Sequence, residues 1–233
     1  MSSNETFGMS VEKSICNIFN LQNDISNNRI NKNIINELKP KLKNYLKDNK
    51  IILTEYIGSC GHQDDFLLEN GKYLQVKTNY NNSEKVCPPK IGQCTKRTFL
   101  LNIAKKINPD IILFDNKDIK EFIFNNIKQI LIIYINAYYT SDIILYVKKF
   151  KNKDYLLTIY DKINLDIRKL DTCEFKFTRN PENWNESSTL KIKYNNKQYS
   201  IGEFQIHKHR NNIKFRFIRN NFHKFIDNIL NQN

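Results

Sequence analysis

An Asn-Gly pair at positions 70 and 71 separates two short apolar runs, residues 65–69 and 72–77. Asn-Gly between two such runs is the strongest short-range signal for a β-hairpin, because both residues tolerate the positive φ of a tight turn. A hairpin here limits how the neighbouring chain can pair, so it constrains the fold more than any other feature of the sequence.

The length of the turn decides which acidic side chain shares a face with Gln75 and Lys77. A two-residue loop pairs residue 69 with residue 72 and places Asp64 on that face. A three-residue loop that ends on a left-handed Gly71 places Asp65 there instead. The turn signal alone leaves both arrangements open.

Helical and extended patterns alternate along the rest of the chain. Ser10 is the expected cap of the first helix, and Pro40 is expected to kink or split the second. Helices are expected over residues 10–19, 31–47, 95–106, 117–127 and 220–230. Strands are expected over residues 51–57, 111–114, 130–137, 143–150, 155–160, 174–178, 190–194, 199–206 and 213–217. This order predicts an α/β fold of the mixed α+β kind, with a central mixed β-sheet flanked by helices and a β-rich C-terminal half.

The charge of the chain points to an anionic partner. Lys and Arg exceed Asp and Glu by 37 to 24, which gives a formal net charge of +13 and a pI of about 9.4. The abundance of Asn, Lys and Ile is typical of an A/T-rich coding sequence, which inflates the lysine count. Arginine is less exposed to that bias, and three of the seven arginines fall between residues 210 and 219. Their clustering is therefore the stronger indication of nucleic acid.

Composition also excludes several classes of protein. Residues 130–139 form the longest apolar stretch, which is far short of the roughly 20 residues that a membrane span requires, and residues 1–10 show no signal peptide. The five cysteines include no pair with the spacing of a structural zinc site, the nearest being Cys60 with His62 and Cys87 with Cys94. We expect reduced thiols, a cytoplasmic location in a bacterium or archaeon, and no membrane partner.

The hairpin segment DDFLLENGKYLQVK, residues 64–77, resembles the active site of the PD-(D/E)XK nuclease superfamily. In that superfamily an Asp begins one strand, and an acidic residue and a Lys, one residue apart, lie on the next. Asp65 directly precedes its strand as the family's Asp does, and is preferred for that reason over Asp64. Two positions depart from the pattern: Gln75 replaces the acidic residue, and Gln63 stands where the family has Pro. Glutamine occurs at this position in restriction enzymes of the superfamily.

The resemblance implies metal-dependent hydrolysis of a phosphodiester bond. Mg²⁺ prefers oxygen ligands, and Asp65, Gln75 and the backbone carbonyl of Val76 are the implied set, with Asp64 as the alternative to Asp65. Mn²⁺ is expected to substitute, and Ca²⁺ to bind without turnover. The cation would neutralise the phosphate and lower the pKa of a bound water, and Lys77 would orient that water. By analogy with the family, Glu12 on the first helix would reach the metal through water.

Two other segments match the acidic-x-Lys pattern and are set aside. Residues 118–120 read Asp-Ile-Lys and follow Pro109-Asp110, but they begin an expected helix, whereas the motif requires its Lys on a strand. Residues 174–176 read Glu-Phe-Lys. Such matches arise by chance in a chain that is rich in Lys.

Two basic segments favour contact with DNA. The first, residues 85–99, surrounds a proline-stiffened loop, and its cations are Lys85, Lys90, Lys96 and Arg97. The second, residues 202–219, predicts two strands around a tight turn at Asn211-Asn212, with one apolar and one polar face. Its expected DNA contacts are Gln205, His207, His209, Arg210, Lys214 and Arg216. Arg or Lys suits guanine and Gln suits adenine.

The combined hypothesis is a type II restriction endonuclease that cuts double-stranded DNA at a short sequence. Residues 1–140 would form the nuclease core and residues 141–233 a β-rich recognition region, together one compact unit. The enzyme would act as a monomer or homodimer, with a cognate DNA methyltransferase in the same system. A structure-specific or repair nuclease of the same superfamily and a non-catalytic basic DNA-binding protein are the alternatives.

Overall fold

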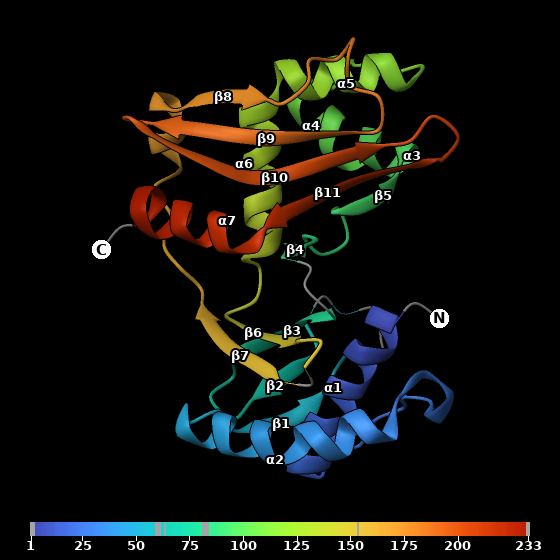
Figure 1. Ribbon diagram of the computed structural model, residues 1–233, viewed down its shortest axis with the longest axis vertical. Coiled ribbons are helices and arrows are strands. Elements are labelled where there is room, and N and C mark those ends of the chain that lie inside the picture. The colour runs from blue at the N-terminus through green and yellow to red at the C-terminus, as the bar shows by residue number, and fades with distance from the viewer. Residues whose placement is uncertain (1–2, 59–61, 63, 81–83, 153, 232–233) are drawn as a thin grey trace. The chain divides into compact units, whose positions relative to one another are not determined.

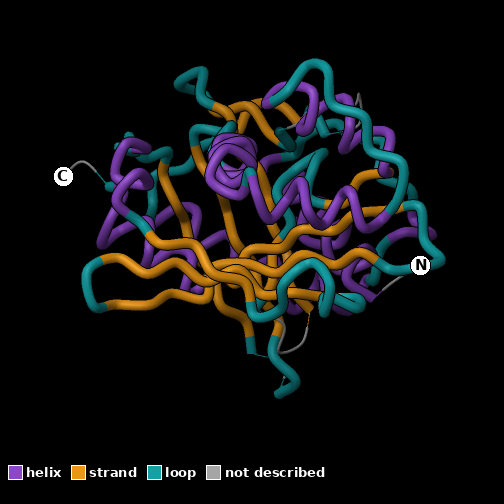
Figure 2. The backbone as a smooth tube through the Cα atoms, turned by 90° about the horizontal axis from the view of Figure 1, so that it is seen from above, coloured by secondary structure: helices purple, strands orange, loops and turns teal. Residues whose placement is uncertain are grey.

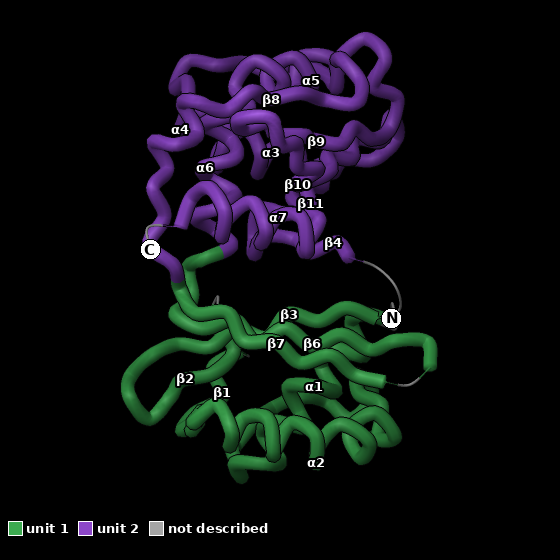
Figure 3. The backbone as a smooth tube through the Cα atoms, turned by 60° about the vertical axis from the view of Figure 1, so that its left-hand side comes forward, with its two compact units in different colours: residues 1–83, 139–162 green, residues 84–138, 163–233 purple. Residues whose placement is uncertain are grey.

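The computed structural model describes residues 3–58, 62, 64–80, 84–152 and 154–231. The chain forms two compact units (Figure 3): unit 1 takes residues 1–83 and 139–162, and unit 2 takes residues 84–138 and 163–233. The chain therefore passes between the units three times. The boundary expected at residue 140 separates a nuclease core from a recognition region, and this functional division stays a prediction. The two compact units of the structure divide the chain at other residues.

Unit 1 is a five-stranded mixed sheet with two long helices (Figure 1). The strands lie in the order β1-β2-β3-β6-β7, and only the β3–β6 pair is parallel. Its elements are α1 (Ser3–Phe19), the short 3₁₀ turn η1 (Asn27–Arg29), α2 (Lys32–Asp48), β1 (Leu53–Tyr56), β2 (Phe66–Leu68), β3 (Tyr73–Tyr80), β6 (Ile143–Lys149) and β7 (Tyr155–Asp161). Apolar residues at helical spacing on α1 and α2 bury against Leu74 and Val76 of β3 and Leu145 and Val147 of β6. This core holds the hairpin strands in place.

One local expectation for unit 1 is wrong: Ser10 does not cap α1, because the helix begins at Ser3. The Ser10 hydroxyl donates to the Thr6 carbonyl and accepts from the Asn31 N–H at 2.8 Å. Of the two effects expected of Pro40, a kink or a split, the split does not occur, because α2 runs unbroken over Lys32–Asp48. The apolar stripe of α2 is fully buried, and this packing outweighs the hydrogen bond lost at proline.

Unit 2 is an antiparallel sheet with helices against its apolar face. The strands lie in the order β4-β11-β10-β9-β8, and β5 also pairs with β11. The strands are β4 (Lys85–Val86), β5 (Gln93–Thr95), β8 (Glu174–Phe177), β9 (Ser187–Tyr194), β10 (Lys197–Ile206) and β11 (Asn212–Ile218). The helical elements are α3 (Lys96–Phe99), η2 (Leu100–Ala104), α4 (Lys105–Ile107), α5 (Asn116–Asn125), α6 (Ile127–Tyr138), η3 (Ile167–Thr172), α7 (Arg219–Phe225) and η4 (Ile226–Leu230).

Two expected strands of unit 2 are absent. Residues 130–137 belong to helix α6, which packs Tyr134 and Tyr138 against the sheet; the ring of Tyr134 stacks on Phe215 with centroids 4.4 Å apart. Residues 111–114 are irregular, with Ile112 67% and Phe114 87% exposed. A short apolar run fits a buried strand and a buried helix equally well, which explains the error at residues 130–137. Residues 111–114 show that a short apolar run can also lie exposed outside any regular element.

The expected fold class is confirmed: the fold is mixed α/β, with a mixed sheet, an antiparallel sheet and a β-rich C-terminal half. Figure 2 shows the helices and strands of the chain by colour. Among the residues that the structure describes, no helix is long and apolar enough to span a bilayer.

Candidate active site

The β2–β3 hairpin closes through a three-residue loop. Gly71 has φ +77°, and its N–H donates to the Leu68 carbonyl at 3.0 Å. The strands pair Phe66 with Leu74. Of the two turns that the sequence allowed, this is the one that directs Asp65 toward the face of Gln75.

The two aspartates at the start of β2 have different partners. The Asp65 N–H donates to the Leu74 carbonyl at 3.0 Å, and the Asp65 carboxylate then acts as the next acceptor: its Oδ2 accepts from the Val76 N–H at 2.6 Å. Asp64 instead accepts a hydrogen bond from the hydroxyl of Ser141, just before β6. The geometry therefore separates Asp65, which faces β3, from Asp64.

Glu12 of α1 lies close enough to Asp65 for their charges to interact. The hydroxyl of Tyr56, at the end of β1, donates to Glu12 Oε2 at 2.9 Å. Burial, and then the charge of Asp65, raise the pKa of Glu12 to about 7, although the hydrogen bond from Tyr56 and the charges of Arg29 and Lys77 oppose that rise. No sequence pattern pointed to Tyr56, because its contact joins residues far apart in the chain.

The pKa of Asp65 is also raised, to about 6. Burial is the main cause; the Val76 N–H and the charge of Lys77 act in the opposite direction, and the charge of Asp64 adds to the rise. Two neighbouring carboxyl groups that both hold protons more tightly than usual form a site that favours added positive charge.

Gln75 and Lys77 lie on β3, one residue either side of Val76. Leu74 and Val76 face the helices, so strand alternation places Gln75 and Lys77 on the opposite face. Gln75 is buried, at 4% exposure, and Lys77 is half-buried. The charges of Asp65 and Lys77 both act on Glu12, and the charge of Lys77 acts on Asp65, so these three groups lie within electrostatic reach of one another at the hairpin.

The donors of this site are oxygens, as Mg²⁺ prefers. Within the described ranges, no group of three His, Cys, Asp or Glu side chains could hold a metal ion. Gln75 contributes an amide oxygen at the position where the superfamily pattern that the hairpin resembles has a carboxylate. Gln63 and Cys60 lie outside the described residues.

The two segments expected to contact DNA lie side by side in the sheet of unit 2. β4 and β5 both pair with β11, with Lys85 opposite Ile218 and Gln93 opposite Lys214. β11 pairs in turn with β10, where Gln205 lies opposite Lys214. Sequence reasoning proposed the two segments separately and did not foresee that they are neighbours.

The predicted alternation of faces along the β10–β11 ribbon is observed. The apolar face is fully buried and consists of Phe204, Ile206, Ile213, Phe215 and Phe217. The opposite face carries Gln205, Lys214 and Arg216, all half-buried. We call this second face, extended over the whole sheet, the outer face of unit 2.

The turn of the ribbon differs from the expected one. β10 ends at Ile206 and β11 begins at Asn212, so the connection spans residues 207–211 instead of a tight turn at Asn211-Asn212. His209 and Arg210 are exposed in this loop, and His207 Nδ1 lies 3.3 Å from the Glu186 carboxylate. Strand alternation therefore does not place the histidines on the outer face.

The remaining predicted cations lie at the start of unit 2. Lys90 is exposed in the loop between β4 and β5, at a positive φ of 59°. Lys96 and Arg97 form the first turn of α3, which Thr95 caps by accepting from the Thr98 N–H at 3.1 Å.

The sequence reasoning missed three outer-face residues. Glu203, on β10, lies opposite Arg216 of β11. Lys191 and Lys193 lie on β9, where they alternate with the buried residues of that strand and so face outward. The same period-two alternation that placed Gln205 outward also predicts these positions, so the signal was present in the sequence.

The candidate site thus combines a buried carboxyl pair with a lysine, in a chain that also carries lysines on one face of the unit 2 sheet. A comparison with known sequences finds a relative among the type II restriction enzymes. Over 170 residues the chain is 38% identical to "Type II restriction enzyme CviAII" of Paramecium bursaria Chlorella virus 1. This match confirms the expected resemblance to type II restriction enzymes.

The match covers 73% of this chain and 44% of the relative, so the chain spans less than half of the relative's length. No protein-family model matches the chain, and no solved structure matches it. Membership of the PD-(D/E)XK superfamily stays a prediction.

Proposed function

We propose that the chain is a type II restriction endonuclease of the PD-(D/E)XK superfamily, which uses Mg²⁺ to hydrolyse double-stranded DNA at a short sequence. The observation that carries the proposal is the convergence of Glu12, Asp65 and Lys77 at the hairpin, in a chain related to a restriction enzyme.

The residues present fit a divalent cation. Asp65, the Gln75 amide oxygen and the Val76 carbonyl would hold it, and Glu12 would reach it through water. The raised pKa values of Glu12 and Asp65 support this assignment. Burial raises both pKa values, and the charge of Asp65 adds to the rise at Glu12 and that of Asp64 to the rise at Asp65, so the site is short of positive charge. Bound there, the cation would supply neutralisation of the phosphate and a more acidic water.

Other residues of the chain would act on the attacking water and the phosphate, and would hold the Glu12 carboxylate in place. Lys77 would orient the attacking water and stabilise charge that develops on the phosphate oxygens. Tyr56 would fix the Glu12 carboxylate through the 2.9 Å hydrogen bond. Mn²⁺ would replace Mg²⁺, and Ca²⁺ would support binding without cleavage.

Unit 2 would hold and read the duplex. Phosphate contacts from lysines position DNA, and base contacts from Gln and Arg specify its sequence. The outer face of unit 2 offers both kinds of side chain. A monomer or homodimer, acting in the cytoplasm of a bacterium or archaeon beside a cognate DNA methyltransferase, completes the proposal.

Digestion of unmethylated phage DNA with Mg²⁺ tests this function. Discrete bands from the wild type are the expected result. D65N and K77A should each lower the cleavage rate by about 10²-fold or more, because each removes a group that acts on the transition state. K72A, at the exposed end of the same hairpin, is the matched control and should cut normally.

Four outcomes would contradict parts of the proposal. Full cleavage by D65N or K77A would show that the assigned site is wrong, and loss of cleavage in D64N alone would move the site to Asp64. A smear would indicate a nonspecific nuclease, and DNA that is bound but intact would indicate a non-catalytic protein. Q75E tests the ligand set, because an added carboxylate should lower the Mg²⁺ concentration needed for half-maximal cleavage.

A further inference from the structure

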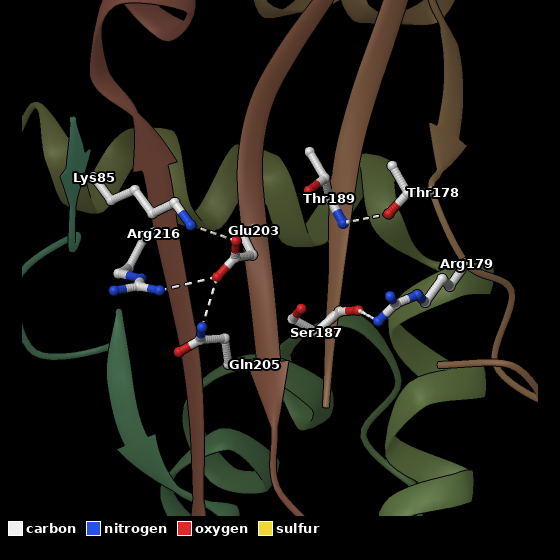
Figure 4. A network of polar contacts seen from close by, with 8 residues as sticks. All are labelled: Lys85, Thr178, Arg179, Ser187, Thr189, Glu203, Gln205 and Arg216. Carbon is white, nitrogen blue, oxygen red and sulfur yellow. Dashed lines mark hydrogen bonds and ion pairs between the residues drawn. The ribbon is translucent and has the colours of Figure 1, made fainter. Parts of the chain in front are cut away.

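Three donors from three neighbouring strands converge on the carboxylate of Glu203 (Figure 4). Arg216 Nη2 lies 2.9 Å and Gln205 Nε2 2.7 Å from Glu203 Oε1. Lys85 Nζ lies 2.5 Å from Oε2. Lys85, Gln205 and Arg216 are residues that the sequence assigned to DNA contact; Glu203 is the acid that joins them.

The Glu203 side chain is 11% exposed, so the carboxylate is largely shielded from water. Burial alone would raise its pKa, but hydrogen bonds from Lys85 and Arg216 outweigh burial and lower it. The group is therefore charged at neutral pH. Stability alone does not require such a cluster, because a buried ion pair contributes little more than well-packed apolar side chains would.

The hydrogen bonds to Glu203 fix the orientation of the Gln205 and Arg216 side chains. A carboxylate only accepts hydrogen bonds, so Gln205 must turn its nitrogen toward Glu203. This leaves the amide oxygen and the second N–H of Gln205, the pair that binds the edge of adenine. Figure 4 shows the other terminal nitrogen of Arg216 pointing away from Glu203, and arginine donors suit the edge of guanine.

We propose that Glu203 is a positioning residue for sequence recognition, which holds Gln205 and Arg216 in the orientation that reads purine edges of the DNA. The inference rests on the proposed function, because it takes duplex DNA as the ligand of the outer face. Orientation fixed before binding reduces the entropy lost on contact, so the cluster would favour the correct base over its competitors.

Selection from randomised duplexes, with Ca²⁺ in place of Mg²⁺, tests the inference through binding alone. The wild type should select a defined sequence. E203Q should select a sequence that is degenerate at one or two positions, and its discrimination against duplexes changed at those positions should fall by about 5- to 150-fold, the range for one base pair. Its affinity for unrelated DNA should not fall, because the substitution removes a negative charge.

E174Q is the matched control. Glu174 lies on β8, 57% exposed beside Lys176 and Lys193, and the substitution changes the net charge equally. It should keep the wild-type selectivity. In R216A, adding E203Q should lower discrimination no further at the position that Arg216 reads, because Glu203 acts there through Arg216.

E203Q with unchanged selectivity would overturn the inference while leaving the proposed function intact. A wild type that neither cuts nor selects any sequence would overturn both. A wild type that selects without cutting would overturn only the nuclease assignment, and the comparison with E203Q would still decide the role of Glu203. Should E203Q fail to fold, E203D keeps the charge, withdraws the carboxylate by one methylene, and should relax the same positions.

Discussion

His223 of α7 is a buried histidine, 7% exposed, whose Nε2 lies 3.3 Å from the Tyr138 hydroxyl. Burial, and then the charge of Arg219, lower its pKa from 6.5 to about 4. The folded protein therefore keeps this ring neutral at pH values where the unfolded chain protonates it. Below the unfolded pKa of 6.5, each fall in pH favours the unfolded state, until the folded ring titrates near pH 4.

We expect this residue to make the protein sensitive to acid. Between pH 6.5 and 4 the wild type should lose about 3 kcal/mol of stability through His223, from the size of the pKa difference. H223F keeps an aromatic ring but removes the titration, so its free energy of unfolding should fall less over that interval. Urea unfolding at a series of pH values measures the difference. H209F, changed in the exposed loop of the ribbon, should follow the wild type; equal slopes for H223F and wild type would refute the assignment.

The hairpin turn shows how one element sets the site. Gly71 has φ +77°, and nothing lies within 4 Å of where a Cβ would stand, so a side chain there meets only backbone strain. G71A should lower the free energy of unfolding by about 1 kcal/mol. G71N should cost less, because asparagine tolerates the left-handed region. Urea unfolding of the two variants checks the order; an alanine variant as stable as the wild type would mean that the turn is not held in this conformation.

Some local signals in the sequence predicted the structure correctly, and others did not. The Asn-Gly turn and the alternation along β10 and β11 depend on neighbouring residues only, and both were confirmed. The cap at Ser10 and the tight turn at Asn211-Asn212 also rested on local signals and were wrong. Helix α6 was missed, because an apolar run has no period that separates a buried helix from a buried strand. What selects the helix is the ring packing of Tyr134 and Tyr138 against the sheet, which only the assembled unit supplies.

The candidate site divides in the same way. Asp65, Gln75 and Lys77 lie within one hairpin and could be named from the sequence. Tyr56 could not, since its bond to Glu12 depends on how α1 lies across β1. Glu203 belongs between these cases. The alternation along β10 is enough to predict that it faces outward, but it was not among the expected DNA contacts. Its three partners come from β4, β10 and β11, and the pairing of those strands is visible only in the sheet.

At the scale of the whole molecule, the net charge of +13 leaves open where DNA binds, because cations lie on both units. If DNA binds at a particular basic face, lysines on that face should matter more than lysines elsewhere. If only the total charge attracts DNA, all exposed lysines should matter equally. Lys191 and Lys214 lie on the outer face of unit 2, whereas Lys43 and Lys47 are exposed on α2 of unit 1. K191A/K214A and K43A/K47A lower the net charge equally, so a purely global effect would make them equal.

We expect them to differ in the salt dependence of binding to a duplex of unrelated sequence. Each lysine that neutralises a phosphate contributes about −0.9 to the slope of log K against log salt concentration, through counterion release. K191A/K214A should therefore reduce the magnitude of the slope by about two, and K43A/K47A should leave it unchanged. Titrations with Ca²⁺ held constant and salt varied between 50 and 200 mM, roughly the range over which such binding weakens steeply, measure both slopes. Equal slopes for the two variants would mean that total charge, and not the outer face of unit 2, holds the DNA.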